Sequence, residues 1–261
     1  MLAPSRQWGT QMKAFSLKSF VRANPHLYDL LLREKRRFSD ETDPLYELLD
    51  RFSQARGGVV RFVAVGAGDG LHNDPLREFI LRDDWRGVLL EPEPVLFQSL
   101  MRNYPVRRFP HLRLVPAALS ARDDEALLLF TVKPDTLVDL QPEIRAKILG
   151  FATLDRDRLL GRLPTIELGA EDIDVIETQP VTLERLAREF FPDRHFDLLA
   201  LDTGGHEAAI LGSLDFERVR PDALLWPANG LGQDKPALTQ KLVRAGYAVR
   251  PIGPVVFASL V

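Results

Sequence analysis

From Val59 to the end of the chain, segments with the pattern of buried strands alternate with segments that have the pattern of helices. The first strand pattern, VVRFVAV, is rich in β-branched residues and runs into a glycine, as is typical of a buried parallel strand. The last two strand patterns, AVRPIG and VVFASL, lie too close together for a parallel crossover, which needs about a dozen residues or more. The sequence therefore predicts an α/β fold, with a doubly wound, mostly parallel sheet that ends in an antiparallel C-terminal edge hairpin.

Three regions of the chain can be separated by pattern. Residues 1–56 have helical patterns, including one over residues 44–52, and are expected to form an N-terminal helical cap. Residues 57–261 are expected to form the α/β domain. Within that domain, residues 133–180 are less regular and partly acidic. Because this segment has few apolar residues from which to build a core, we expect an insertion rather than a separate domain.

Several local structures are also expected. The pattern DPLREFILRDDW predicts a helix that has Asp74 as its N-cap and Pro75 at its first position. LRLVPAAL is expected to form one strand, and EALLLFTV a further strand or one arm of a hairpin. In the insertion, helices are expected over residues 142–150 and 156–163.

The composition excludes several classes of function. The 261 residues include no cysteine, which rules out disulfides, thiolate metal sites and cysteine nucleophiles, and which favours a reducing compartment. No apolar run approaches the ~20 residues that a transmembrane helix needs, and the N-terminus lacks the apolar core of a signal peptide. We therefore expect a cytoplasmic protein without a membrane span. The net charge of -3 and the lack of a basic and aromatic stacking motif argue against nucleic acid as a partner.

The sequence GAGDG directly follows the first strand, where ligands bind in open sheets of this kind. Gly66 permits a tight turn, Gly68 lets backbone N–H groups approach a ligand, and Gly70 leaves room for the residues after the turn. Dinucleotide folds carry G-x-G-x-x-G, whereas here the third glycine comes one residue early and position 71 is leucine. This spacing favours a turn for S-adenosylmethionine over one for a dinucleotide.

Glu91 lies at the end of the second strand pattern, about twenty residues beyond the glycines, a spacing typical of a ribose-binding acid. At that position a carboxylate can accept hydrogen bonds from both hydroxyls of a ribose. The alternative is that Glu91 and Pro92 only form a solvated strand end.

Two longer stretches resemble the FkbM family of methyltransferases. FVAVGAGDGLHNDPLREFILRDDWRGVLLEPEPVLFQSLMRNY is similar to the first half of the family, in which a V-G-A-x-D-G turn, an N-D-P and a W-x-G-x-L-x-E-P run recur at this spacing. DLLALDTGGHEAAILGSLDF is similar to the family's D-x-E-G-x-E-x-x-x-L segment. The resemblance extends from about Val59 to the end of the chain and leaves the N-terminal cap outside it.

The resemblance implies a seven-stranded methyltransferase fold. It also implies transfer of the methyl group of S-adenosylmethionine to a hydroxyl of a sugar, a polyketide or a related metabolite. The residues expected to bind the cofactor are Gly66, Ala67, Gly68, Asp69, Gly70, Asp74, Glu91, Pro92 and Ala117. The N-terminal helices and residues 133–180 are expected to form a lid that selects a small-molecule or carbohydrate acceptor.

Asp202 and His206 are the candidate catalytic residues, and His72 and Glu207 the candidate substrate contacts. A carboxylate or imidazole within hydrogen-bond reach of a hydroxyl can act as its general base. Simpler readings remain open: Asp202 as a cap of the following turn, and His72 on a solvent-facing loop. The segment DTGGHE lacks any spacing diagnostic of a metal site, so no metal is expected.

Three positions depart from the family's pattern, because Ala64, Gly204 and Pro227 stand where the family carries acids. Catalytic impairment is therefore an alternative, in which the domain serves only as a binding or scaffolding module. A dinucleotide-dependent oxidoreductase is a third reading. The identity of the acceptor and the number of subunits stay open.

Overall fold

The computed structural model describes residues 24–25, 27–31 and 43–261. Most of the expected N-terminal cap, residues 1–56, lies outside the described residues. Within the cap, residues 27–31 are helical, and helix α3 (Pro44–Gln54) confirms the helix expected over residues 44–52. No helix in the described part of the chain is long and apolar enough to span a membrane.

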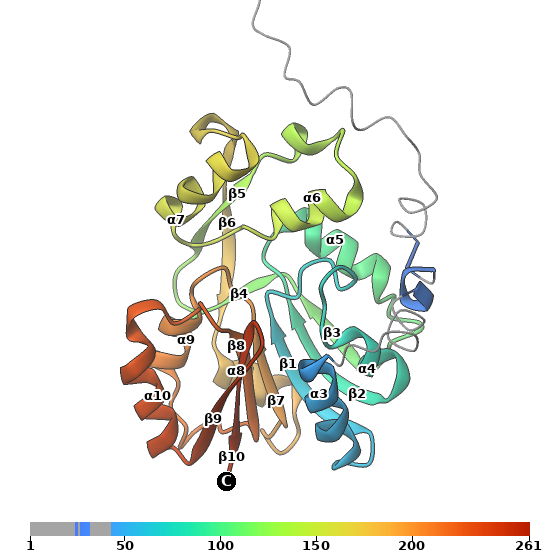
Figure 1. The fold of residues 1–261 in the computed structure, drawn as a ribbon, viewed down its shortest axis with the longest axis vertical. Coiled ribbons are helices and arrows are strands. Elements are labelled where there is room, and N and C mark those ends of the chain that lie inside the picture. The colour runs from blue at the N-terminus through green and yellow to red at the C-terminus, as the bar shows by residue number, and fades with distance from the viewer. Residues whose placement is uncertain (1–23, 26, 32–42) are drawn as a thin grey trace, which may run out of the picture.

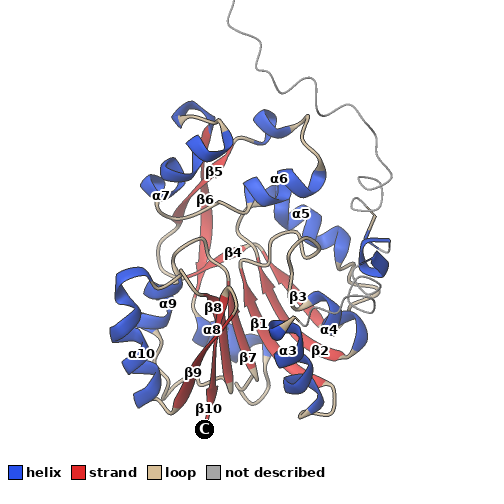
Figure 2. Ribbon diagram, in the orientation of Figure 1, coloured by secondary structure: helices blue, strands red, loops and turns tan. Residues whose placement is uncertain are grey.

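A seven-stranded sheet forms the centre of the molecule, with the strand order β3-β2-β1-β7-β8-β10-β9 (Figure 2). Its strands are β1 (Val59–Val65), β2 (Asp84–Leu90), β3 (Leu112–Val115), β7 (Leu198–Leu201), β8 (Ala223–Pro227), β9 (Tyr247–Ile252) and β10 (Val255–Leu260). Neighbouring strands are parallel except at β10, which is antiparallel to both β8 and β9. The predicted doubly wound sheet and its C-terminal edge hairpin are confirmed.

Helices cover both faces of the sheet because alternate side chains of each strand point to opposite faces. In β1, Phe62 and Ala64 pack on one face, and Val63 and Val65 on the other. The first face is covered by α3, α4 (Arg77–Arg82) and α5 (Pro94–Asn103). The second face is covered by α8 (Leu183–Phe190), α9 (Glu207–Ser213) and α10 (Lys235–Arg244).

The expected helix after the glycine turn is shorter than its pattern. Helix α4 begins at Arg77, so the prediction of Asp74 as its N-cap is wrong; the Asp74 carboxylate instead accepts a hydrogen bond from the Leu76 N–H, at 2.8 Å. At the other end, Trp85 belongs to β2. Its indole is fully buried, stacks on Phe79 with ring centroids 5.3 Å apart, and donates to the Ser53 hydroxyl at 3.0 Å. The helix α4 therefore ends at Arg82, because the Trp85 side chain is buried as part of β2.

The pattern LRLVPAAL forms two strands in different sheets rather than one strand. Pro116 separates β3 from β4 (Ala117–Leu119), and proline has no N–H with which to continue a ladder. Strand β4 pairs in parallel with β6 (Ile173–Val181), which also pairs antiparallel with β5 (Leu127–Val132). The end of the expected insertion, residues 173–180, is thus part of a strand in a second, three-stranded sheet.

The segment between β5 and β6 folds into a small lobe beside the second sheet (Figure 1). Its elements are η2 (Pro134–Leu137), α6 (Pro142–Leu149), α7 (Arg156–Arg162), η3 (Leu163–Ile166) and η4 (Ala170–Asp172). Contrary to the expectation of too few apolar residues, the lobe has a buried cluster that includes Leu137, Leu149 and Leu159. Leu96 of α5 completes this cluster, so the lobe is packed onto the main domain.

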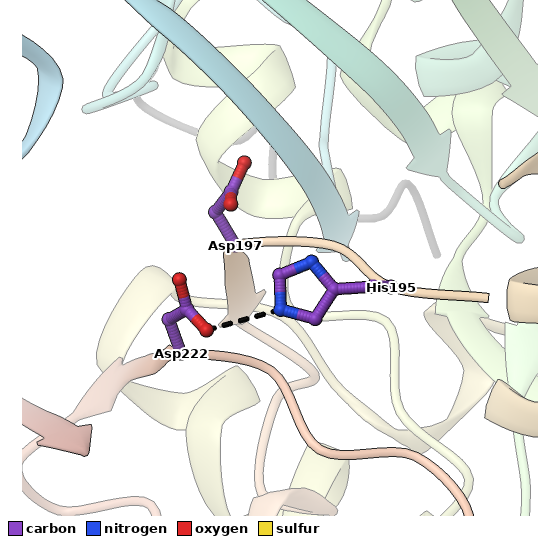
Figure 3. Close-up of side chains that lie close together, drawn as sticks. All are labelled: His195, Asp197 and Asp222. Carbon is purple, nitrogen blue, oxygen red and sulfur yellow. Dashed lines mark hydrogen bonds and ion pairs between the residues drawn. The ribbon is translucent and has the colours of Figure 1, made fainter. Parts of the chain in front are cut away.

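His195, Asp197 and Asp222 meet at the amino ends of β7 and β8, at the end of the sheet opposite to the glycine turn (Figure 3). One ligand-type atom from each of the three lies within 4.8 Å of the others. His195 Nε2 lies 3.0 Å from Asp222 Oδ1, and Arg61 donates to His195 Nδ1 at 2.7 Å. These partners place the imidazole proton on Nε2, so this nitrogen donates to the aspartate and has no lone pair for a metal.

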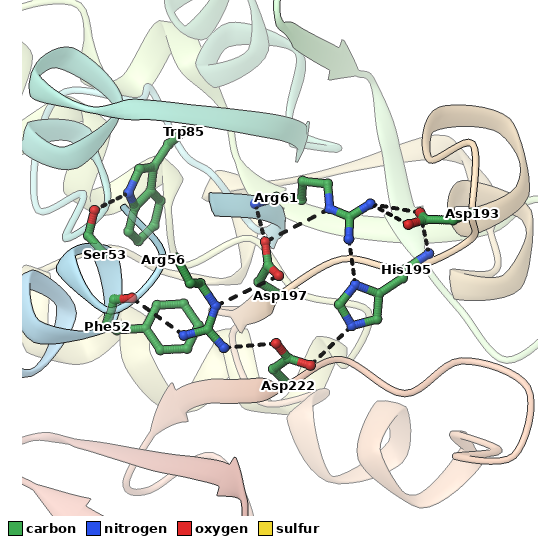
Figure 4. Close-up of polar contacts among 9 residues, drawn as sticks. All are labelled: Phe52, Ser53, Arg56, Arg61, Trp85, Asp193, His195, Asp197 and Asp222. Atoms are coloured by element: carbon green, nitrogen blue, oxygen red, sulfur yellow. Dashed lines mark hydrogen bonds and ion pairs between the residues drawn. The ribbon is translucent and has the colours of Figure 1, made fainter. Parts of the chain in front are cut away.

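Arginines neutralise the carboxylates of the same group (Figure 4). Arg56 lies 2.8 Å from Asp222, and Arg61 donates its backbone N–H to Asp197 at 2.5 Å. The backbone of Asp197 also bonds to Arg61 O and to the N–H of Ala223. Asp197 therefore connects the first residues of β7 to β1 and β8, and the group is a structural network.

Replacing Asp197 by alanine should lower the free energy of unfolding by about 2–3 kcal/mol, because it leaves the Arg61 backbone N–H without its acceptor and removes one of the two carboxylates near each of Arg56 and Arg61. The matched control is Asp193→Ala, which removes an ion pair of Arg61 at an exposed position and should cost much less. Urea denaturation of the three proteins would measure both losses. Equal losses in the two variants would contradict the structural role given to Asp197.

Candidate functional site

The glycine turn lies where the ends of three strands meet. The N–H groups of Gly66 and Ala67 both donate to Leu90 O at the end of β2, at 2.9 Å. Asp202, just after β7, donates its N–H to Val65 O at the end of β1, at 2.8 Å. Gly66 has a φ of +73°, and a Cβ there would lie 1.8 Å from Asp202 O. Only glycine permits this approach, which holds Asp202 against the turn.

Glu91 lies beside the glycines, as the sequence predicted, and its side chain is buried at 4% exposure. Its two carboxylate oxygens accept hydrogen bonds from the N–H groups of Gly68 and Glu93, at 2.7 and 2.8 Å. Burial raises the pKa of Glu91 to about 8, and the charges of Glu93 and Asp202 add to the effect. The N–H of Gly68 is therefore already bonded to Glu91, while Gly68 still lines the cavity above the turn.

Asp69 and His72 are locked together in the turn. Asp69 Oδ1 accepts from the N–H groups of Leu71 and His72, and Asp69 Oδ2 lies 2.6 Å from His72 Nδ1. Burial opposes the charge of Asp69, but its bonds with His72 hold the pKa of this carboxyl below its usual range. The His72 side chain is 5% exposed and packs edge-on against Tyr28. The reading of His72 as part of a solvent-facing loop is therefore wrong.

A cavity of about 780 Å³ opens above the turn, within the size range of small-molecule sites. Residues of the small lobe, 146–147 and 149–154, face the strand ends across it. The residues expected to bind the cofactor that line this cavity are Gly66, Ala67, Gly68, Asp69, Asp74, Glu91 and Pro92. Gly70 belongs to the same turn but packs against Leu100 and Tyr104 instead. Among the lining residues are also His72, Asp202 and His206.

Ala117 is not among the residues that line the cavity, so its expected place there is corrected. Because β4 begins only after Pro116, the Ala117 side chain points into the core beside α8, and its neighbours Ala118 and Leu119 line the cavity. Asp74 is buried, which raises its pKa, and its second oxygen accepts from the Tyr104 hydroxyl at 3.1 Å.

A second cavity of about 500 Å³ adjoins the first. Asp202, Arg162, Pro227 and Pro254 line both cavities. The other lining residues of the second cavity are Arg158, Gly204, Gly205, Glu207, Ala228, Asn229 and Gly230. Asp202 therefore stands at the junction of a cavity over the glycine turn and a cavity that opens beside it.

Asp202 has the properties of a poised base. Asp202 is exposed where it opens onto the two cavities, but the protein around its carboxylate desolvates the charge and raises its pKa to about 6, and the nearby charge of Glu207 adds to this. Its carboxylate accepts no hydrogen bond from any described residue, so it does not cap the following turn. That task falls to Glu207, which is 1% exposed and accepts from the Thr203 N–H at 2.7 Å. Glu207 Oε1 thus holds the loop after β7, while Glu207 also lines the second cavity, and its role as a substrate contact stays a prediction.

His206 lies next to this loop with its imidazole partly buried. Burial lowers its pKa, which keeps the ring neutral at pH 7. Its Nε2 is buried and has no partner among the described residues. His206 therefore lines the same cavity as Asp202, and no described residue forms a hydrogen bond with its Nε2.

Two glycines after Asp202 make room for the small lobe. A Cβ on Gly204, which has a φ of +65°, would lie 2.8 Å from Ala152 O. A Cβ on Gly205 would lie 2.0 Å from Arg158 Cζ. A side chain at position 204, where the family pattern has an acid, would therefore collide with the backbone of the small lobe. Nothing in the structure explains Ala64 in the same way.

Unpartnered polar atoms gather around the two cavities. In the described part of the chain, nine buried side-chain nitrogen or oxygen atoms have no hydrogen-bond partner, and five of them belong to residues that line one of the two cavities. These five are Arg158 Nε, Thr203 Oγ1, His206 Nε2, Glu207 Oε2 and Trp226 Nε1. Buried polar groups are normally paired, so this concentration is typical of a site that receives a polar ligand.

Sequence reasoning missed Arg158, Arg162 and Trp226. The two arginines are four residues apart on α7, a spacing that places them on one face of a helix and that could have been noticed. Trp226 lies near the end of a continuous apolar strand, and no local signal separates it from an ordinary core residue.

No curated protein matches the sequence. Among solved structures, the human methyltransferase 10 domain containing protein is 14% identical, with 92% of this chain and 94% of that chain covered and a TM-score of 0.40. Fibrillarin from Aeropyrum pernix, in complex with natively bound S-adenosyl-L-methionine, is 11% identical, with 76% and 66% covered and a TM-score of 0.37. These scores are too low to add to the argument.

The family comparison is decisive. Residues 64–248 match the Methyltransferase FkbM domain, which is most of the described α/β domain. The match includes the glycine turn, Glu91 and the loop that carries Asp202, and it supports S-adenosylmethionine as the cofactor. It gives no support to the dinucleotide reading. The chain belongs to the FkbM methyltransferase family.

Proposed function

We propose that this protein is an S-adenosylmethionine-dependent O-methyltransferase that acts on a hydroxyl of a sugar, a polyketide or a related small metabolite. The observation that carries the proposal is the position of Asp202, whose carboxylate is unpaired among the described residues and lies at the junction of the two cavities. The cavity over the glycine turn is assigned to the cofactor, and the adjoining cavity to the acceptor. The cytoplasmic location and the exclusion of nucleic acid stay predictions.

The residues around the first cavity fit the cofactor. Glu91 lies against the glycine turn, where its carboxylate would accept hydrogen bonds from the ribose hydroxyls. The turn from Gly66 to Gly70 and Pro92 would line the remainder of the nucleoside, and Trp226 Nε1 offers a buried donor. When bound, S-adenosylmethionine supplies a methyl group on a positively charged sulfur.

Asp202 would act as the general base. With a pKa of about 6 it is mostly ionised at pH 7, and it is a stronger base than an ordinary aspartate. The bound cofactor would supply the methyl group for an in-line displacement by the acceptor oxygen. The hydroxyl proton passes to Asp202. Because this displacement disperses charge, positioning of the two reactants in adjoining cavities supplies much of the rate.

The lost acids favour a second candidate, a binding module without catalysis. Two observations weigh against it: a side chain at position 204 would collide with the backbone of the small lobe, and a base remains at the cavity junction. Calorimetric titration with S-adenosylmethionine and S-adenosylhomocysteine tests the proposal. Micromolar binding of both, with transfer of labelled methyl groups to hydroxylated small molecules, supports the enzyme. Absence of binding at millimolar cofactor would overturn it.

Binding of S-adenosylhomocysteine should release close to one proton at pH 7. Glu91 has a pKa of about 8 and is mostly protonated at pH 7, whereas ribose hydroxyls that donate to it would favour the ionised form. The affinity should therefore rise with pH up to about 8, by at most about tenfold per pH unit. Calorimetry in buffers of different ionisation enthalpy measures the released protons.

The matched control for proton release is Glu91→Gln, which keeps the shape of the side chain and should release none. Proton release that is the same in wild type and Glu91→Gln would show that another group titrates, and the ribose role of Glu91 would be wrong.

Asp202→Asn should lower kcat by about 10²–10⁴-fold, the usual contribution of a general base, and change the affinity for S-adenosylhomocysteine by less than about threefold. In the wild type, kcat/KM should rise with pH through the Asp202 pKa of about 6. Transfer of labelled methyl groups to an acceptor found in the same assay measures both. His206→Gln is the comparison: a larger loss of kcat in this variant than in Asp202→Asn would assign the base to the histidine instead.

A further inference from the structure

Two arginines of the small lobe line the acceptor cavity. Arg158 and Arg162 lie four residues apart on α7, both partly buried. The Arg158 guanidinium rests on Gly205, where even a methyl group would collide with it, and the Arg162 guanidinium lies 5.2 Å from the centre of the Phe151 ring. Both side chains are thus held in place by contacts that leave their N–H groups unused.

Neither guanidinium forms an ion pair with a residue that the structure describes. Within the described ranges, no carboxylate oxygen lies within 4.0 Å of Arg158 or Arg162, no hydrogen bond from either guanidinium is formed, and the Nε of Arg158 is buried without a partner. Other arginines that are buried or half-buried have a carboxylate close by: Arg77 lies 2.7 Å from Asp29, and Arg56 lies 2.8 Å from Asp222. Arg158 and Arg162 differ from these arginines because no described carboxylate or carbonyl accepts a hydrogen bond from their guanidinium groups.

The two charges also repel each other. Burial lowers the pKa of Arg162, and the neighbouring charge of Arg158 lowers it further. Asp202 and Glu207 offset part of this at longer range. A bound anion would relieve both the desolvation and the repulsion, and guanidinium groups match the geometry of a carboxylate or a phosphate through paired N–H donors.

We propose that Arg158 and Arg162 bind an anionic group of the methyl acceptor, a carboxylate or a phosphate, and thereby hold its hydroxyl beside Asp202. This inference rests on the proposed function and narrows it to acidic acceptors such as sugar acids or sugar phosphates. The two glycines after Asp202 belong to the same arrangement, because Gly205 gives Arg158 the space in which it reaches the cavity.

The test compares anionic and neutral probes on protein saturated with S-adenosylhomocysteine. Glucuronate, inorganic phosphate and glucose are titrated by calorimetry into the wild type and into Arg158→Gln, Arg162→Gln and Arg156→Gln. Glucuronate or phosphate should bind at least tenfold more tightly than glucose. Tighter binding of glucuronate would indicate a carboxylate on the acceptor, and tighter binding of phosphate would indicate a phosphate. Arg158→Gln and Arg162→Gln should each weaken that binding at least tenfold.

Arg156→Gln is the matched control, since Arg156 lies on the same helix, is exposed and lines neither cavity. Its anion affinity should stay within about twofold of the wild type. Equal binding of glucuronate, phosphate and glucose by the wild type, or anion binding that is unchanged in Arg158→Gln and Arg162→Gln, would overturn the inference. The comparison of probes on the wild type needs no variant to fold.

The affinity for S-adenosylhomocysteine, measured in the same proteins, separates this inference from the proposed function. It should change by less than about threefold in Arg158→Gln and Arg162→Gln. A loss of tenfold or more would assign the arginines to the carboxylate of the cofactor and overturn the inference. Tight cofactor binding without arginine-dependent anion binding would overturn the inference alone, whereas no cofactor binding by the wild type would overturn the proposed function as well.

Discussion

The close approach of Gly66 to the backbone carbonyl of Asp202 is the contact on which the site depends. It brings the end of β1 against the end of β7, and the hydrogen bonds from the turn to Leu90 add the end of β2. Glu91 and Asp202 then lie at the ends of β2 and β7, and desolvation raises the pKa of both, although Glu91 is buried and Asp202 is exposed to the cavities. A single side chain at position 66 would separate the groups that we assign to the ribose and to the acceptor.

The small lobe supplies residues to both cavities of the site. Its residues 146–147 and 149–154 line the cavity opposite the strand ends. Its backbone lies against Gly204, and its helix α7 places Arg158 and Arg162 at the second cavity. On our proposal these two guanidinium groups favour an acidic acceptor, and Asp202 acts as the general base.

The sequence predicted the sheet, the glycine turn and the position of Glu91, because each follows from local pattern and from the rule that parallel strands end at one edge. It failed where contacts between distant segments decide the outcome. Trp85 is drawn into β2 by its burial against Phe79, and Pro116 moves Ala117 into another sheet. The sequence did not show that Arg158 and Arg162 line a cavity. This placement depends on the space beside Gly204 and Gly205, which exists only in the folded chain.

A crystal structure of the complex with S-adenosylhomocysteine would locate the cofactor relative to both carboxylates. We expect the ribose hydroxyls within about 2.6–3.2 Å of the Glu91 carboxylate, with the sulfur directed toward the cavity junction at Asp202. A ligand bound away from the glycine turn, or a Glu91 side chain that keeps only its backbone partners while the ribose lies elsewhere, would contradict this expectation.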